Sequence, residues 1–433
     1  MRWVADIVYL LAGLLYLPLA MYNAIFLGKN RRGWRQRFGS VPRFDPNTPR
    51  IWIHAVSLGE VNATPQLADA LREGLPGTDI VLSTTTDTGY ARAVQLYGAD
   101  RVFRFPLDFS LVISRVLRRV RPTMIVLVEL EVWYNLVRIA TRRGIPVAVV
   151  NGRLTQRSKR RFQRLGAVAR SMFRDLAWVG AQDETIAARF RSLGVAPDRI
   201  EITSSLKWDT AQVTDRVEDA DSLAAALGLD GSRRVWVCGS TGPGEEEILL
   251  AGYRTISHGP SPPVLVLVPR KPERFDEVAR LIGDTGFTCV RRSQRPDGTP
   301  AASLPDRAVI LGDTMGELRK FYSLANVVFI GRSLVPLGGS DPMEAAALGK
   351  AIVAGPHMEN FESPVSLLRE ANAIRVIETA DELSSVIGEL LADESARDRM
   401  GTAARNVVLR NQGATKRTVD QLVKLMGSDT RNG

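Results

Sequence analysis

Charged side chains follow several apolar runs in the first half of the chain. Glu60 comes after RIWIHAVSLG, Glu129 and Glu131 come after IVLV in the stretch IVLVELE, and Lys207 comes after RIEITSSL. Ligands of open α/β sheets gather at the carboxyl ends of strands, so these positions point to chemistry. A carboxylate that follows a buried strand is costly unless it is paired or functional. The alternatives are an ion pair with one of the many arginines and a place in an active site.

The second half contains a stretch typical of phosphate binding, FIGRSLVPLGGSDPMEAAALG. A predicted strand runs into a glycine-rich loop, and a helix starts near Pro342 with Glu344 in its first turn. Free N–H groups at a helix start can bind phosphate, and Glu344 could accept two ribose hydroxyls. The alternative is ordinary capping by Asp341.

Upstream, GDTMGEL repeats this arrangement, with Gly316 and Glu317 opening another predicted helix. Two such turns flanking one strand favour a nucleotide site over simple capping. In VLVPRKPERF, Arg270 follows a buried strand and could hold a phosphate in a bidentate fork. The turn CGSTGPGEEE is a weaker signal, and a plain turn is the better interpretation there.

These residues need strands and helices that alternate. Short continuous apolar runs bounded by polar turns are typical of strands buried on both faces of a parallel sheet. Two such series occur, separated by a stretch at 210–234 without strand character, which we interpret as a connection between domains. The sequence therefore predicts two βα domains in series with a ligand between them. The predicted strands are 50–54, 79–85, 101–105, 123–129, 145–151, 177–182 and 199–203, then 235–240, 264–269, 308–312, 327–331 and 351–355.

Composition narrows the class of protein. The chain has 433 residues, 45% of them hydrophobic, and a formal net charge of +10, which suits an acidic partner such as a phosphorylated substrate, an anionic surface or nucleic acid. Two distant cysteines and three histidines argue against a disulfide framework and a zinc site.

The N-terminal segment at 4–27 is apolar apart from Asp6 and Asn23, and a basic stretch follows it. It is long enough to reach across a bilayer core of roughly 30 Å, and the basic flank predicts that the rest of the chain is cytoplasmic. The alternative is a helix that lies in the membrane interface, because Asp6 and Pro18 weaken a full span. Both interpretations place the protein at a membrane.

Eight stretches together resemble the Kdo transferase family, whose members add 3-deoxy-D-manno-octulosonic acid (Kdo) to a lipid A precursor. In chain order they are HAVSLGE, ELEVWYN, NGRLTQRS, SSLKWD, PRKPERF, DTMGEL, GRSLVPLGG with DPMEAAALG, and GPHMENF. They run from residue 54 to about residue 361, and the apolar segment with its basic flank precedes them. One such stretch is weak, but eight in the right order are highly specific.

The resemblance implies an α/β fold of the GT-B glycosyltransferase type. In that fold two Rossmann-like domains flank an active-site cleft, and in this family an N-terminal membrane-anchor helix precedes them. We therefore expect the anchor at 1–28, an acceptor-binding domain at 29–212 and a CMP-sugar donor-binding domain at 213–433.

The family's catalytic base falls on Glu60. The resemblance implies that Glu60 removes the proton from the acceptor's primary hydroxyl as that oxygen attacks the anomeric carbon of Kdo. The transition-state residues of the family match Glu129, suited to stabilise an oxocarbenium-like centre, and Lys207, suited to neutralise the departing phosphate. Direct displacement would invert the anomeric centre without a covalent intermediate.

The resemblance also implies a CMP-Kdo donor held by residues from three loops. Those that match the family's CMP contacts are Pro269, Arg270, Met315, Gly316, Glu317, Asp341, Pro342, Met343 and Glu344. No Asp-x-Asp motif stands out, so we predict transfer without a metal or another cofactor. The chain departs from the family pattern at Lys271, Ser340 and Asp341, which bears on donor specificity.

We therefore expect a glycosyltransferase of lipopolysaccharide core biosynthesis that uses CMP-Kdo and the lipid A precursor lipid IVA. The expected location is the anionic surface of the inner membrane, with one N-terminal anchor, the catalytic domains on the cytoplasmic side and no nucleic-acid partner. An alternative is a GT-B enzyme that uses another CMP-ulosonic acid or a UDP-sugar on a lipid acceptor. An inactive protein that binds anionic surfaces is disfavoured, because Glu60, Glu129 and Lys207 are all retained.

Overall fold

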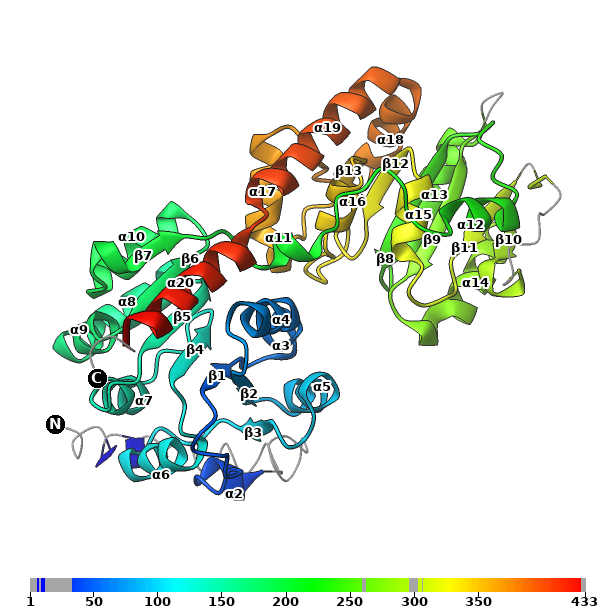
Figure 1. The fold of residues 1–433 in the computed structure, drawn as a ribbon. Helices are drawn as coiled ribbons and strands as arrows, with labels where there is room; N and C mark the ends of the chain where they lie inside the picture. The colour runs from blue at the N-terminus through cyan, green and yellow to red at the C-terminus, as the bar shows by residue number, and fades with distance from the viewer. Residues whose placement is uncertain are drawn as a thin grey trace. The chain divides into compact units, whose positions relative to one another are not determined.

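The computed structural model describes residues 6, 7, 9–11, 33–258, 262–295, 303–305 and 307–429 (Figure 1). The described chain divides into two compact units. Unit 1 comprises residues 1–210 together with 412–433, and unit 2 comprises residues 211–411. Each unit is built on a parallel sheet, as the two series of apolar runs predict.

Within the described part of unit 1, seven parallel strands form one sheet in the order β3-β2-β1-β4-β5-β6-β7. The central strand β1 pairs with β2 on one side and with β4 on the other, so that Ile53 lies beside both Leu82 and Val126. The strands are β1 Arg50–His54, β2 Asp79–Thr84, β3 Val102–Arg104, β4 Met124–Val128, β5 Val147–Gly152, β6 Trp178–Ala181 and β7 Ile200–Ile202.

Helices cover both faces of this sheet (Figure 1). Side chains alternate along a strand, so Trp52 enters one core while Ile51 and Ile53 enter the other. Helices α6, α7, α9 and α10 complete the first core, and α4, α5 and α20 complete the second. The helices of unit 1 are α2 Trp34–Arg37, α3 Leu58–Asn62, α4 Pro65–Gly74, α5 Asp87–Tyr97, α6 Ser110–Val120, α7 Tyr134–Thr141, α8 Gln156–Arg164, α9 Ala167–Arg174, α10 Glu184–Leu193, α11 Lys207–Thr210 and α20 Ala414–Asp429.

The residues described in unit 2 form a second sheet of seven parallel strands, in the order β10-β11-β9-β8-β12-β13-β14. Its strands are β8 Val235–Thr241, β9 Val264–Pro269, β10 Thr288–Arg291, β11 Ala308–Leu311, β12 Val327–Ile330, β13 Ala351–Ala354 and β14 Arg375–Val376. Its helices are α12 Ala220–Leu227, α13 Glu246–Ile256, α14 Phe275–Asp284, α15 Leu318–Leu324, α16 Met343–Ala347, α17 Glu362–Glu370, α18 Glu382–Ala392 and α19 Glu394–Asn411.

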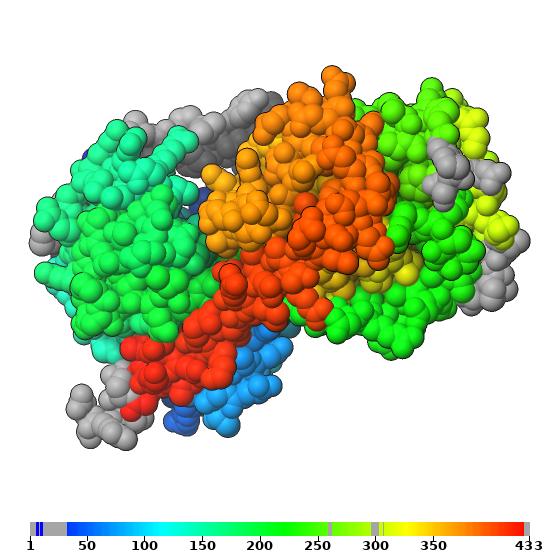
Figure 2. Space-filling model, turned by 90° about the horizontal axis from the view of Figure 1, so that it is seen from above, coloured from blue at the N-terminus to red at the C-terminus, as the bar shows by residue number. Residues whose placement is uncertain are grey.

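The C-terminal segment belongs to unit 1, not to the second domain predicted at 213–433. In Figure 2 the red helix α20 lies along the segments of unit 1. Ala414, Val419 and Leu422 of α20 are buried in the same core as α4. The predicted assignment of residues 412–433 is therefore wrong, because the apolar face of α20 completes the core of the first sheet.

The predicted N-terminal anchor requires a second correction. Residues 6, 7 and 9–11 are helical, and the Asp6 carboxylate accepts hydrogen bonds from the backbone N–H of Ser110 at 2.9 Å and from the side chain of Asn135 at 3.0 Å. A carboxylate bound to the protein's own helices is poorly placed to enter a bilayer. Across the described residues, none of the helices is both long enough and apolar enough to cross a membrane. This finding overturns the predicted inner-membrane location through a single anchor. Most of the predicted anchor at 1–28 lies outside the described residues.

Candidate active site

The sheet of unit 1 reverses its strand order at β1 and β4, which are hydrogen-bonded neighbours. Ligands of open α/β folds bind outside the carboxyl ends of the strands at such a point. Glu60 follows β1, Glu129 follows β4, and Lys207 opens α11 after β7. The charges of Glu60 and Lys207 both act on the pKa of Glu129, so the three predicted residues lie near one another at the carboxyl ends of these strands.

Glu60 is oriented by hydrogen bonds at the start of α3. One carboxylate oxygen accepts the backbone N–H of Val56 at 2.8 Å, and the other accepts the Ser57 hydroxyl at 2.8 Å and its N–H at 3.3 Å. The Ser57 side chain in turn accepts the N–H of Glu60, which completes a capping box. The half-buried carboxylate is therefore held in one orientation while its Val56-bound oxygen keeps a further lone pair for a proton.

Glu129 lies in strained backbone. Its φ is +63°, in the left-handed region that residues with a Cβ rarely adopt. Asn151 near the end of β5 and Ser204 after β7 have φ values of +53° and +67°. Such strain persists only where the surrounding structure enforces it, and it clusters at functional sites. The ends of three strands of this sheet therefore carry a feature typical of an active site.

Two carboxylates at these strand ends, Glu129 and Glu131, have raised pKa values. Burial raises the pKa of Glu129, and Glu60 raises it further, while Arg153 and Lys207 oppose the rise. Burial, followed by the charges of Glu60 and Glu129, raises the pKa of Glu131 to about 7. Acidic groups with raised pKa values next to a lysine fit proton transfer better than a structural ion pair.

Asn151 and Arg153 belong to this site, although the sequence did not single them out as site residues. The buried Asn151 side chain accepts the backbone N–H of Leu206 at 3.2 Å, which fixes the loop just before Lys207. Arg153 lies close enough to oppose the pKa rise of Glu129. Asn151 is the last residue of the strand predicted at 145–151, and Arg153 follows two residues later; this position at a strand end is the signal that could have identified them.

His54, the last residue of β1, is structural. Its ring is fully buried, stacks on Phe105 with centroids 3.8 Å apart, and lies 3.0 Å through Nδ1 from the carbonyl oxygen of Ser83. Burial lowers the pKa of His54 to about 3, so the ring is neutral at physiological pH. It cannot reach a substrate, and the proton-accepting role is left to the carboxylates.

Unit 2 reverses its strand order at β8 and β12. The backbones that leave these strands approach closely, because a Cβ built on Gly331 would lie 2.6 Å from the carbonyl oxygen of Ser240. The N–H of Arg270, after β9, donates to the carbonyl oxygen of Thr241 at 3.2 Å. The segments that follow β8, β9 and β12 thus meet at the carboxyl ends of these strands. They contain Arg270, directly after Pro269 at the end of β9, and the turn before Asp341.

The predicted turn at Met315, Gly316 and Glu317 leads into α15. Met315 is exposed, and Gly316 has a φ of +85°. The Glu317 carboxylate accepts two hydrogen bonds from Arg292, at 2.9 and 3.0 Å. Burial alone would raise the pKa of Glu317, but the hydrogen bonds from Arg292 and Thr314, together with the charges of Arg292 and Lys320, outweigh burial and lower that pKa. This carboxylate is therefore already engaged within the protein.

The second predicted turn runs from Asp341 to Glu344. The N-cap of α16 is Pro342, and an Asp341 carboxylate oxygen accepts the N–H of Met343, the first residue of that helix, at 2.8 Å. Pro342 and Met343 are buried, whereas Glu344 is half-buried. Burial raises the pKa of Glu344, and Arg319 opposes the rise. Asp341 thus binds one N–H at the start of α16 without being its N-cap, and Glu344 keeps a carboxylate for hydroxyl groups.

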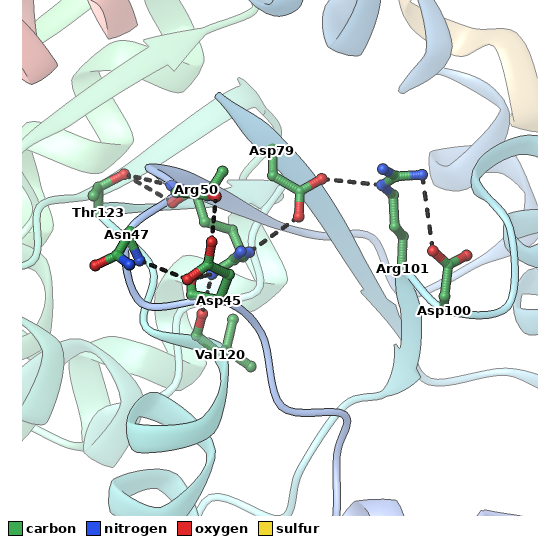
Figure 3. A network of polar contacts seen from close by, with 9 residues as sticks. Asp45, Asn47, Arg50, Asp79, Asp100, Arg101, Val120 and Thr123 are labelled. Carbon is green, nitrogen blue, oxygen red and sulfur yellow. Dashed lines mark hydrogen bonds and ion pairs between the residues drawn. The ribbon is translucent and has the colours of Figure 1, made fainter. Parts of the chain in front are cut away.

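A polar network that is not a catalytic arrangement lies at the amino ends of the strands of the unit 1 sheet, opposite the candidate active site (Figure 3). Arg50 begins β1, is 2% exposed, and donates to Asp79 at 3.2 Å and to the carbonyl oxygen of Val120 at 2.9 Å. Arg101 binds the second oxygen of Asp79 at 3.0 Å. A cavity of about 620 Å³ borders these residues. Its buried charges are already paired, which fits a role in holding the strands together.

Comparison with solved structures defines the class of fold. Acinetobacter baumannii MurG matches with a TM-score of 0.55 at 13% identity, covering 87% of this chain and 99% of that chain. At this identity the likeness concerns the fold alone. Two parallel-sheet α/β units, each with its loops at a strand-order reversal, define the GT-B glycosyltransferase fold.

Comparison of sequences identifies the family. Residues 32–210 match the family model described as 3-Deoxy-D-manno-octulosonic-acid transferase (kdotransferase). The 3-deoxy-D-manno-octulosonic acid transferase of Haemophilus influenzae is 35% identical over 398 residues, which cover 90% of this chain and 91% of that protein. The transferase of the same name from Bordetella pertussis is 34% identical and covers 88% of this chain and 89% of its own length. The chain therefore belongs to the 3-deoxy-D-manno-octulosonic acid (Kdo) transferase family and is a glycosyltransferase, as the eight stretches predict.

Proposed function

We propose that this protein transfers Kdo from CMP-Kdo to the lipid A precursor lipid IVA in lipopolysaccharide biosynthesis. The observation that carries the proposal is the convergence of Glu60, Glu129 and Lys207 at the strand-order reversal of unit 1. These residues come from three distant parts of the sequence. Family membership supports the transferred sugar, and the residues supply the chemistry.

Glu60 is the proposed general base. Its carboxylate is fixed by Val56 and Ser57, so its remaining lone pair has a defined direction. We propose that it takes the proton of the acceptor hydroxyl as that oxygen bonds to the anomeric carbon of Kdo and the bond to the phosphate of CMP breaks. This single displacement inverts the anomeric centre. Lys207 neutralises the charge that collects on the departing phosphate, and Glu129 stabilises the positive charge on the sugar ring.

Unit 2 supplies the proposed donor site. Arg270 binds the phosphate, and Glu344 accepts the hydroxyls of the ribose. Pro269, Met315, Gly316, Asp341, Pro342 and Met343 line the CMP moiety through their backbone or apolar atoms. Glu317 holds its loop in place through Arg292, which is consistent with an indirect part in binding.

The first test is the reaction itself. The purified protein is incubated with lipid IVA and with CMP-Kdo generated in place, and the lipid is weighed by mass spectrometry. A gain of one or more Kdo masses would support the donor, the acceptor and the reaction together. No gain with CMP still bound would indicate another CMP-linked sugar acid or another acceptor. No gain and no CMP binding would exclude the proposed donor site.

The second test is Glu60→Gln. The glutamine oxygen can still accept one of the hydrogen bonds that Val56 and Ser57 donate at the start of α3, so the fold should survive. The amide cannot take a proton. We expect turnover to fall by roughly 10²–10⁴-fold, while the dissociation constant of CMP changes by less than about twofold. Glu73→Gln on the exposed surface of the same unit serves as the control. Normal turnover of Glu60→Gln would disprove the assignment of the base.

A further inference from the structure

Arg332 lies where the strand order of unit 2 reverses, two residues after β12. Its φ is +63°, a left-handed conformation that residues with a Cβ rarely adopt. Its backbone follows Gly331, whose N–H donates to the carbonyl oxygen of Gly239 at 2.8 Å. A strained conformation at this position requires a structure that enforces it and suggests that the side chain has a use there.

Glu245 enforces this conformation. It is fully buried, and its carboxylate accepts four backbone N–H groups: Arg332 at 2.5 Å, Ser333 at 2.9 Å, Leu334 at 3.0 Å and Gly242 at 3.3 Å. Three of these donors are consecutive in the loop after β12. The buried carboxylate therefore fixes the direction in which the Arg332 side chain leaves the backbone.

The Arg332 side chain lies beside the turn at Thr241 and Gly242. A Cβ built on Gly242 would lie 3.0 Å from its Cγ, and one guanidinium nitrogen donates to the carbonyl oxygen of Leu337 at 2.9 Å. Arg270 borders the same turn, because its N–H donates to the carbonyl oxygen of Thr241. Two arginines from different loops therefore flank one turn at the predicted donor site.

The two guanidinium groups repel one another. Burial lowers the pKa of Arg332, and the positive charge of Arg270 lowers it further. For the stretches of unit 2 that the structure describes, no acidic side chain forms an ion pair with either arginine. The nearby Glu245 carboxylate opposes the repulsion only in part and is already occupied by four N–H groups. Two adjacent guanidinium groups are stabilised when an oxyanion binds both.

We propose that Arg332 acts with Arg270 as a two-arginine clamp for one oxyanionic group of the donor. The inference rests on the proposed CMP-sugar donor, and it adds a residue that the motif comparison did not assign. A CMP-linked sugar acid carries two such groups, the phosphate and the sugar carboxylate. Arg332 is a binding residue in this proposal, and Glu245 is a positioning residue.

The test uses Arg332→Gly, because glycine adopts a φ of +63° without strain and the fold should be kept. CMP and cytidine are titrated into the wild-type protein and the variant by calorimetry, and the KM for CMP-Kdo is measured. If the clamp binds the phosphate, we expect the Kd of CMP to rise roughly tenfold or more, with the weaker binding of cytidine unchanged. If it binds the sugar carboxylate, the Kd of CMP stays constant and the KM for CMP-Kdo rises by a similar factor. In both cases the affected constant, Kd or KM, should take a value for Arg332→Lys between those of Arg332→Gly and the wild type.

Arg399→Gln, an exposed residue of α19, removes the same charge from unit 2 and should change neither quantity. Changes of less than about twofold in both quantities for Arg332→Gly would overturn the clamp while leaving the donor assignment intact. A wild-type protein that binds no CMP would overturn both. If Arg332→Gly melts at or above the melting temperature of the wild type, its weaker binding of the donor is not caused by a folding defect.

Discussion

Glu131 shows most clearly how the candidate active site of unit 1 changes the pKa of a single residue. It is half-buried, accepts the Trp133 indole N–H at 3.0 Å, and shares its surroundings with Glu60 and Glu129. The pKa near 7 means that the folded protein keeps a proton on this group at pH values where the unfolded chain has released it. The folded state is therefore stabilised by this group below about pH 4.5 and loses that contribution as the pH rises through about 7.

Glu131→Gln should remove this dependence, because the amide resembles the protonated acid. At pH 8 we expect the variant to be more stable than the wild type by about 1 kcal/mol, allowing for solvent screening of a half-buried group, or about 2–4 °C in Tm. At pH 4 the two should melt together. Thermal unfolding at both pH values, with Glu73→Gln as the exposed control, measures this. If the Tm of Glu131→Gln differed from that of the wild type by the same amount at both pH values, the raised pKa of Glu131 would be contradicted.

The sequence indicates some site residues and not others for physical reasons. Glu60, Glu129 and Lys207 follow strand ends directly, and the resemblance assigns them roles. Arg332 could not be singled out among 57 lysines and arginines, because its placement depends on a positive φ and on a carboxylate 87 residues earlier. Neither the positive φ of Arg332 nor its contact with that carboxylate can be recognised from the spacing of residues in the sequence.

At the scale of elements, α7 depends on a residue from outside its own segment. Its N-cap, Trp133, has no side-chain acceptor for the first N–H groups. The buried Asp108 carboxylate supplies both oxygens instead, accepting the N–H of Asn135 at 2.9 Å and of Leu136 at 2.8 Å. Because α7 begins just after Glu131 and Trp133, this remote cap also fixes one side of the candidate active site.

Asp108→Ala should leave two buried N–H groups of α7 without a partner. We expect the free energy of unfolding to fall by roughly 2–4 kcal/mol, and transfer to weaken because the loop at Glu131 loses its support. Asp183→Ala removes the half-buried cap of α10, which receives the N–H of Ile186 at 2.7 Å, and should cost only about 1 kcal/mol. Denaturant unfolding of both variants gives the comparison. Equal losses would show that burial of the cap does not matter.

The interior strands could be predicted more accurately than the edges. The run at 50–54 matches β1 residue for residue, because a continuous apolar run is typical of a strand buried on both faces. Strands β10 and β14 lie at the sheet edges, where Thr288 and Arg375 are exposed, and neither was predicted. The connection at 210–234 also contains α12, whose short apolar stretch gives only a weak helical pattern.

For the whole molecule, the main departure from the prediction is that unit 1 is discontinuous in sequence. Two hydrogen bonds hold the returning chain, from the N–H groups of Gly413 and Thr415 to the Asp209 carboxylate, at 2.6 and 2.5 Å. Arg417 adds a bond to the carbonyl oxygen of Thr203 at 2.8 Å. Sequence pattern could predict the helix but not the sheet it covers, since an apolar helix face fits either unit.

Leu422→Ala should therefore destabilise unit 1, although residue 422 follows unit 2 in the sequence. Leu422 is fully buried against the core of α4, and its truncation should cost about 2–5 kcal/mol. Amide hydrogen exchange should accelerate in β1, β2 and β4 and remain unchanged in β8 and β12. Leu390→Ala in α18 should accelerate exchange in β8 and β12 and leave β1, β2 and β4 unchanged. Faster exchange in unit 2 after Leu422→Ala would refute the division of the chain.

The return of α20 also sets the order in which the newly made chain can mature. The ribosome synthesises β1 to β7 early, but it makes residues 414–429 only after all of unit 2. Until then the apolar side chains of Leu67 and Leu71 lack the helix that covers them. Unit 2 can complete its core first even though it is translated second, which reverses the usual N-to-C order of domain folding. A nascent chain that stalls before residue 414 would present this uncovered face to chaperones.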